Sequence, residues 1–83
     1  MEIKSWNTYK KDNGIKKDTN ILKLRDKGFV KLPYVMKKST DETKPKDLVS
    51  KSVAGLDYDL VVFHYNDTPF EKGGSISIFA IKL

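Results

Sequence analysis

The sequence predicts a small domain that is mainly β (or α+β), with five strand candidates and at most one short helix, near residues 47–54. Two observations lead to this prediction. Residues 57–83 read as two apolar strands joined by a loop, and residues 30–37 alternate between two faces. With 83 residues, the chain is expected to form one domain, residues 1–83, with a small core.

The first, basic part of the chain (residues 1–38) reads as strands. Asn13-Gly14 favours a hairpin, because both residues tolerate the positive φ of a type I′ turn. We therefore predict a strand over 3–11 and a returning strand over 16–25. Three large side chains in the first of these recur at every third position, which would equally suit a short helix: Ile3, Trp6 and Tyr9.

Residues 29–37 form the next strand candidate. Pro33 cannot donate to a ladder, so this strand should lie at the edge of a sheet or be broken by a bulge. Lys31, Lys37 and Lys38 agree, because charged side chains protect an exposed edge from unwanted pairing. Four apolar or aromatic residues alternate here and are expected to share one face: Val30, Leu32, Tyr34 and Met36.

A polar loop over residues 39–47 contains no apolar residue and separates the basic strands from the C-terminal hairpin. A helix of one or two turns can follow it. Asp47 is a plausible N-cap for this helix, and Gly55 is a plausible C-terminal stop.

The hairpin of residues 57–83 holds the densest apolar surface in the chain. Both of its strands are apolar on both faces, as in the run LVVF at 60–63, so we expect them to lie in a sheet with both faces covered or inside a small barrel or sandwich. The connector is predicted over Thr68–Gly74, with Gly73-Gly74 as its hinge.

Three architectures are compatible with this order of elements. They are a five-stranded antiparallel sheet, an SH3-like or OB-like barrel, and an α+β sheet covered by the short helix. No segment repeats at a fixed period, which argues against a repeat protein.

The composition of the chain indicates the cellular compartment in which the protein is expected. The chain has no cysteine, so it has neither a disulfide nor a thiolate site, which fits a reducing compartment. The longest apolar run has four residues, far short of the ~20 that span a bilayer. The first residues also lack the apolar core of a secretory signal. We therefore expect a cytoplasmic protein that does not enter a membrane.

No motif points to catalysis, a metal or a cofactor, and we predict that the protein is not an enzyme. His64 is the only histidine and falls within a predicted strand, where a structural position on the sheet is the simpler explanation. Asp57 and Asp59 have no metal-binding spacing and read as solvated acids at a strand end. Gly73-Gly74 lacks the pattern of a phosphate-binding loop.

Charge is unevenly distributed within the net charge of +5. Residues 1–50 carry thirteen Lys/Arg and seven Asp/Glu, whereas residues 51–83 carry three and four. Aromatic residues are interleaved with these cations, and proteins that bind single-stranded nucleic acid combine the two. The sequence therefore predicts a surface that binds nucleic acid, preferably single-stranded, formed by Trp6, Tyr9, Lys10, Lys11, Lys16, Lys17, Lys23, Arg25, Phe29, Lys31, Tyr34, Lys37 and Lys38.

The alternative is a non-catalytic protein-binding module, such as an inhibitor or adaptor of the kind found on mobile elements. It would contact an acidic protein surface through the edge strand 29–37 or the loop 39–47, and a homo-oligomer could form through the same edge. Lys outnumbers Arg fifteen to one, which argues against specific base reading. Nucleic-acid binding needs four aromatic side chains exposed among the lysines, and the alternative is favoured if they are buried: Trp6, Tyr9, Phe29 and Tyr34.

Overall fold

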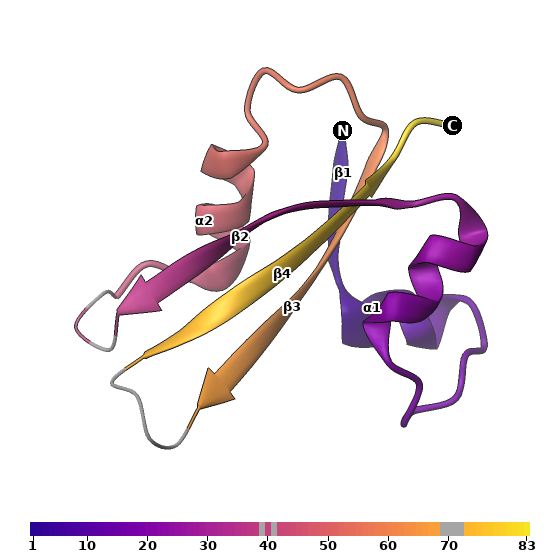
Figure 1. Cartoon of the computed structure of the whole chain (residues 1–83), viewed down its shortest axis with the longest axis horizontal. Coiled ribbons are helices and arrows are strands. Elements are labelled where there is room, and N and C mark those ends of the chain that lie inside the picture. Colours follow the sequence, from indigo (N-terminus) through magenta and orange to yellow (C-terminus); the bar gives the residue numbers. More distant parts are fainter. Residues whose placement is uncertain (39, 41, 69–72) are drawn as a thin grey trace.

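A four-stranded mixed sheet lies at the centre of the computed structural model, which describes residues 1–38, 40, 42–68 and 73–83 (Figure 1). The strands are Glu2–Ser5 (β1), Val30–Lys38 (β2), Leu60–Thr68 (β3) and Gly73–Ile81 (β4). Their order across the sheet is β1-β3-β4-β2. β1 runs parallel to β3, whereas β4 pairs antiparallel with both β3 and β2.

Helices cover both faces of this sheet. An α-helix, Trp6–Asp12 (α1), and a 3₁₀-helix, Ile21–Lys27 (η1), pack on one face. A second α-helix, Pro45–Ser52 (α2), packs on the other. In Figure 1, α1 and η1 lie at one end of the sheet and α2 lies toward the opposite end. The prediction that both faces of the C-terminal hairpin are covered is confirmed.

The alternation of side chains along the hairpin divides the interior into two apolar cores. Val62 of β3 points to one face, and its neighbours Val61 and Phe63 point to the other. The α1-side core consists of Trp6, Tyr9, Ile21, Leu24, Phe29, Val62 and Phe79. The α2-side core consists of Val49, Val53, Val61, Phe63, Ile76, Ile78 and Ala80.

The strand predicted over residues 3–11 is wrong beyond Ser5, because the chain becomes helical there. Ser5 ends β1 and caps α1, and its Oγ accepts a hydrogen bond from the backbone N–H of Thr8 at 3.2 Å. The helix then places Trp6 and Tyr9 on one face, and both are buried. Trp6 and Tyr9 of the three-residue recurrence therefore belong to a helix, whereas Ile3 lies on β1 and packs on the α2-side core.

The strand predicted over residues 16–25 is also helical in its second half. Asn20 caps η1, and its Oδ1 accepts a hydrogen bond from the N–H of Leu22 at 2.9 Å. Gly28 ends η1 with a φ of 93°, which glycine adopts without steric cost. Asn13–Gly14 is a turn after α1 and does not connect two strands.

The sheet is mixed, and it contains four strands within the described ranges. The predicted five-stranded antiparallel sheet and the SH3/OB-like barrel are not confirmed, because two of the predicted strands are helical over half or more of their length and β1 pairs in parallel. In the part of the chain that the structure describes, two α-helices and one 3₁₀-helix replace the single predicted helix. The broader prediction of a small β-rich, α+β domain is confirmed.

β2 confirms the predicted edge strand. It is the last strand in the sheet order, and in the described part of the chain it pairs with β4 alone. The register shifts between Leu32 and Val35, so a bulge falls at Pro33, which cannot donate to the ladder. Because Leu32 and Val35 both pack on the α2-side core, the strict alternation expected over residues 30–36 fails at this bulge.

α2 begins earlier than the sequence predicts. Its N-cap is Lys44 instead of Asp47, and a proline, whose φ suits the first helical turn, occupies the first turn. The helix stops before Gly55, which lies in the following turn. The predicted polar loop is correspondingly shorter, and its residues 39 and 41 lie outside the described residues. None of the helices that the structure describes is long and apolar enough to cross a membrane.

The hairpin connector is shorter than predicted. β3 continues to Thr68, and both Gly73 and Gly74 belong to β4, so they do not form a hinge. Gly74 is buried near the start of β4, between β3 and β2, where it pairs with Lys37 of β2 on one side. The rest of the predicted connector, residues 69–72, lies outside the described residues.

Candidate functional site

Three of the four aromatic side chains that were expected to stack on bases are buried. Trp6 is only 2% exposed, and Tyr9 and Phe29 are buried beside it. The ring of Tyr9 stacks on Trp6 with centroids 5.8 Å apart and meets Phe29 edge-on at 5.9 Å. These three rings pack against one another in the core, so a base cannot stack on them. Tyr34, which is 63% exposed, is the one of the four that a ligand can reach without rearrangement.

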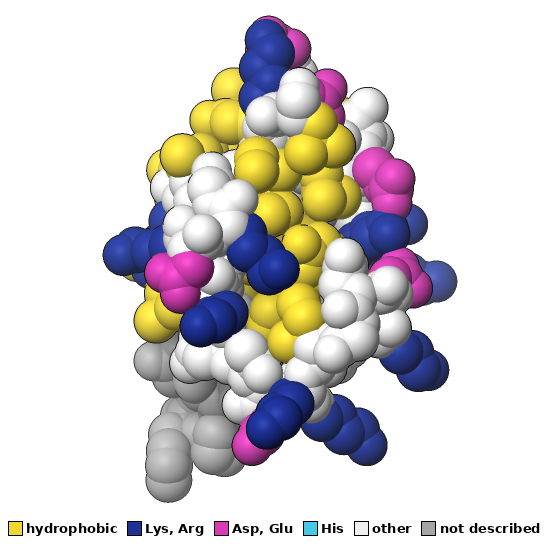
Figure 2. All heavy atoms as spheres, turned by 90° about the vertical axis from the view of Figure 1, so that its right-hand side faces the viewer, with side chains coloured by type: hydrophobic (Ala, Val, Ile, Leu, Met, Phe, Trp, Pro, Cys, Tyr) yellow, Lys and Arg dark blue, Asp and Glu magenta, His cyan; other side chains and the backbone are white. Residues whose placement is uncertain are grey.

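The predicted basic residues are spread over several elements. On the face in Figure 2, Lys and Arg side chains surround an apolar band and stand beside Asp and Glu side chains, instead of forming a continuous basic track. Four of the thirteen predicted residues converge on one hollow, namely Trp6, Lys10, Lys17 and Lys31. The other cations lie on α1 (Lys11), in the next loop (Lys16), on η1 (Lys23, Arg25) and on β2 (Lys37, Lys38).

The hollow has a volume of about 420 Å³ and lies where α1, η1 and the loop between them meet the sheet. Lys10 is 8% exposed, and its Nζ donates a hydrogen bond to the carbonyl O of Lys17 at 2.6 Å. The same ammonium lies 5.5 Å from the centroid of the Trp6 ring, within the range of a cation–π interaction. Lys17 and Lys31 are exposed at the hollow's lining.

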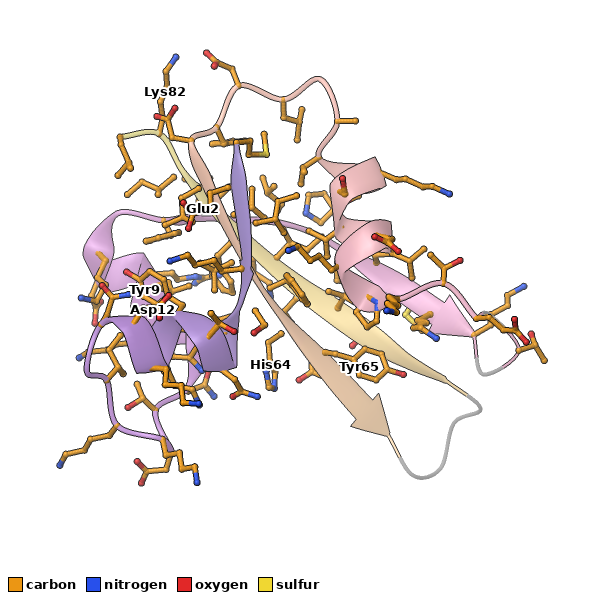
Figure 3. The ribbon with its side chains drawn as sticks, turned by 180° about the vertical axis from the view of Figure 1, so that it is seen from behind. Glu2, Tyr9, Asp12, His64, Tyr65 and Lys82 are labelled. Carbon is orange, nitrogen blue, oxygen red and sulfur yellow. The ribbon has the colours of Figure 1, made fainter. Side chains whose placement is uncertain are left out.

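The sheet contributes polar side chains that were not among the predicted site residues: His64, Asn66 and Ser77. His64 of β3 faces Ser77 of β4 across the strand pair, and the Nδ2 of Asn66 donates to the Oγ of Ser77 at 3.1 Å. Figure 3 shows His64 on the side of β3 toward α1, with Tyr65 on the opposite side. Polar residues at every second position of otherwise apolar strands were the signal in the sequence.

Burial is the main cause of a lowered pKa at His64, which falls below the usual value of 6.5, and the positive charge of Lys10 lowers this pKa further. The folded state therefore binds the histidine proton more weakly than the unfolded state does. This contribution to stability is complete above about pH 6.5, and it is lost as the pH falls from there through the folded-state pKa.

Replacing His64 by glutamine is expected to remove this part of the pH dependence. Between about pH 7.5 and pH 5, the melting temperature of the wild type should fall more steeply than that of His64→Gln. Thermal unfolding followed by circular dichroism in a series of buffers measures both curves. The carboxylates titrate in both proteins and cancel in the difference, so parallel curves would contradict the prediction.

The acids that were weighed as metal ligands have other partners. Asp57 forms an ion pair with Lys82, and the Oδ2 of Asp59 accepts the backbone N–H of Leu83 at 2.6 Å. Both carboxylates therefore hold the last residues of the chain against the start of β3. Within the described ranges, no three His, Cys, Asp or Glu side chains form a group that could hold a metal ion.

The edge formed by β2 is the second candidate surface. Three large side chains on this strand are exposed: Val30 (47%), Tyr34 (63%) and Met36 (57%). Met36 stands opposite Ser75, so its side chain lies on the same face of the sheet as the hollow. Lysines accompany these apolar groups along the strand, so β2 presents both charge and apolar area next to its backbone edge.

Comparison of the chain with protein-family models, with curated proteins and with solved structures finds no match.

Proposed function

We propose that this protein is a non-catalytic protein-binding module that adds an extended, acidic segment of a partner protein to the edge of β2. The position of β2 at the end of the sheet, with three exposed apolar side chains, is the observation that supports this proposal most strongly. A terminal strand presents backbone N–H and C=O groups that a further strand can pair with. An inhibitor or adaptor can work through such a contact alone.

The charge on β2 determines the kind of segment that fits. Lys31, Lys37 and Lys38 give the strand three positive charges and no negative one. A second copy of β2 would bring lysines next to lysines, which disfavours pairing between identical chains. A segment with Asp or Glu at alternate positions neutralises these charges instead. The same lysines therefore select for an acidic partner and against self-association.

The bulge in β2 determines where the contact is made. Pro33 interrupts the ladder, and the register shift around it leaves Tyr34 exposed beside the edge. Tyrosine is enriched among the residues that dominate binding energy at protein interfaces, because it buries a large apolar area and keeps a hydrogen-bonding hydroxyl. Tyr34 and Met36 are accordingly the side chains expected to anchor the partner.

Burial of the aromatic residues is the reason for preferring a protein partner to nucleic acid. Trp6, Tyr9 and Phe29 are held in the α1-side core, so base stacking on these rings would require partial unfolding. Nucleic-acid binding remains a second proposal, limited to contacts with phosphate. It is supported by the three lysines that line the hollow.

A defined peptide tests the proposal. A synthetic nine-residue peptide in which Glu alternates with Val should bind ¹⁵N-labelled protein and shift the amide resonances of residues 30–38. Tyr34→Ala is expected to weaken this binding about tenfold, or about 1.4 kcal/mol, because tyrosine is enriched among the interface residues that dominate the binding energy. Leu56→Ala, at an exposed residue before β3, serves as the matched control and should leave the affinity unchanged.

A second peptide, with Lys in place of Glu, measures the electrostatic part of the contact. It should bind much more weakly, and the affinity of the acidic peptide should fall as salt is added. Equal binding of the two peptides would exclude the proposed charge selection. Resonance shifts confined to β1 or to the hollow would exclude β2 as the site.

A further inference from the structure

The hollow beside α1 concentrates more positive charge than the carboxylate in its described lining can balance. Lys10, Lys17 and Lys31 contribute three ammonium groups, whereas Asp18 is the only acid among the lining residues that the structure describes. None of the ion pairs found in the described part of the chain involves these three lysines. Lys10 is the most consequential of them, because its ammonium is held in a largely buried position where charge interactions are weakly screened.

Several hydrogen-bond donors around the hollow still have capacity for a ligand. The ammonium of Lys10 has three protons, and the carbonyl of Lys17 takes one of them. Ser77 accepts from Asn66 through its Oγ, which leaves its own O–H able to donate. Asn20 uses its Oδ1 to cap η1, so its amide NH₂ is also available.

We infer that this hollow binds a phosphate group. Compact ammonium groups act as point charges toward phosphate oxygens, and three of them match a doubly charged ion better than a singly charged carboxylate. The lining contains no arginine, whose planar fork would favour a carboxylate held at two points. A volume of about 420 Å³ exceeds what phosphate alone needs, and the apolar lining from Ile21 and Phe79 suits an attached organic group.

This site shares Lys31 with the edge proposed to bind protein, and its other lining residues lie outside β2. Lys17 lies in the loop after α1 and not on β2, so a change at Lys17 tests the hollow without altering the edge. His64 supplies a probe inside the hollow. A bound anion should stabilise its protonated ring and raise its pKa from the lowered value in the free protein.

Titration of the intact protein with inorganic phosphate, with adenosine monophosphate and with a single-stranded oligothymidylate tests the inference. All three should shift the resonances of His64, Ser77 and Lys17 at low ionic strength. Lys17→Gln is expected to weaken binding of each about three- to tenfold, and a ring titration should show a raised His64 pKa in the presence of phosphate. Lys51→Gln, on α2 and therefore on the opposite face, removes the same charge and should change the affinity less than twofold.

The three ligands also distinguish the source of the phosphate. Similar affinity for adenosine monophosphate and the oligonucleotide would identify a free nucleotide, whereas much tighter, steeply salt-dependent binding of the oligonucleotide would identify a nucleic-acid backbone. Either result supports the phosphate site, provided that Lys17→Gln weakens it. Equal losses from Lys17→Gln and Lys51→Gln, or no response of His64 to phosphate, would overturn it.

Discussion

Trp6→Ala is expected to lower the free energy of unfolding by about 3–5 kcal/mol, the usual cost of truncating a buried tryptophan. Trp6 is 2% exposed, and its indole Nε1–H donates to the carbonyl O of Thr19 at 3.0 Å. That bond ties the loop before η1 to the first turn of α1. The substitution therefore opens a cavity in the α1-side core and also releases the loop that forms one wall of the hollow.

Urea unfolding followed by far-ultraviolet circular dichroism measures this loss, because the substitution removes the only tryptophan and with it the fluorescence signal. Trp6→Phe keeps an aromatic ring but loses the indole N–H, and it should cost less, about 1–3 kcal/mol. Leu22→Ala, at an exposed leucine of η1, should change stability by about 0.5 kcal/mol or less. A loss below about 1 kcal/mol for Trp6→Ala would show that this ring does not organise the core.

The same variants separate a structural tryptophan from a ligand-binding one. If Trp6 stacked on a nucleic-acid base, Trp6→Phe would weaken oligonucleotide binding with little change in stability. The buried position predicts instead a clear loss of stability in Trp6→Phe.

The parts of the fold that the sequence predicted are those with a strong local pattern. The C-terminal hairpin has two runs that are apolar on both faces, and it forms with both faces covered. Pro33 marked the edge strand because a missing N–H excludes a central position. The segment containing Trp6 and Tyr9 carried two competing patterns, and the hairpin signal of Asn13-Gly14 was given more weight than the three-residue period. In the folded protein the side chain of Ser5 caps α1, which favours the helix over the strand after this residue.

The hollow could be predicted only in part, for a related reason. The interleaving of cations with aromatic residues predicts Lys10, Lys17 and Lys31, but their convergence depends on α1 turning back over the sheet, which no local pattern shows. His64 was judged as an isolated histidine. Its environment comes from Asn66 on its own strand and from Ser77 on the next strand, so it depends on the register of β3 against β4.

Gly74→Ala is the second large expected effect, a loss of about 1–3 kcal/mol, the usual cost of adding a group to a packed site. Two effects oppose each other here. Replacing glycine by alanine restricts the unfolded chain and would stabilise the protein by about 0.4–1 kcal/mol if the site had room. It has none, because a Cβ at this position would overlap the carbonyl O of Asn66 and lie 2.9 Å from the ring of Tyr65. The obstacle is backbone within the sheet, so it cannot move aside cheaply.

The two effects predict opposite signs for the change in the free energy of unfolding. Chemical denaturation of Gly74→Ala and of matched variants measures this sign. Ser75→Ala, at the next residue of β4, should change stability by only about 0.5 kcal/mol. Gly14→Ala separates backbone conformation from space. Gly14 has a φ of 63° with nothing within 4 Å of a Cβ, so alanine there meets only the left-handed backbone, at a cost of about 1 kcal/mol. A stabilised Gly74→Ala protein would mean that β3 and β4 can separate at this point, and that Gly73-Gly74 is a hinge, as the sequence suggested, and not a site of close strand packing.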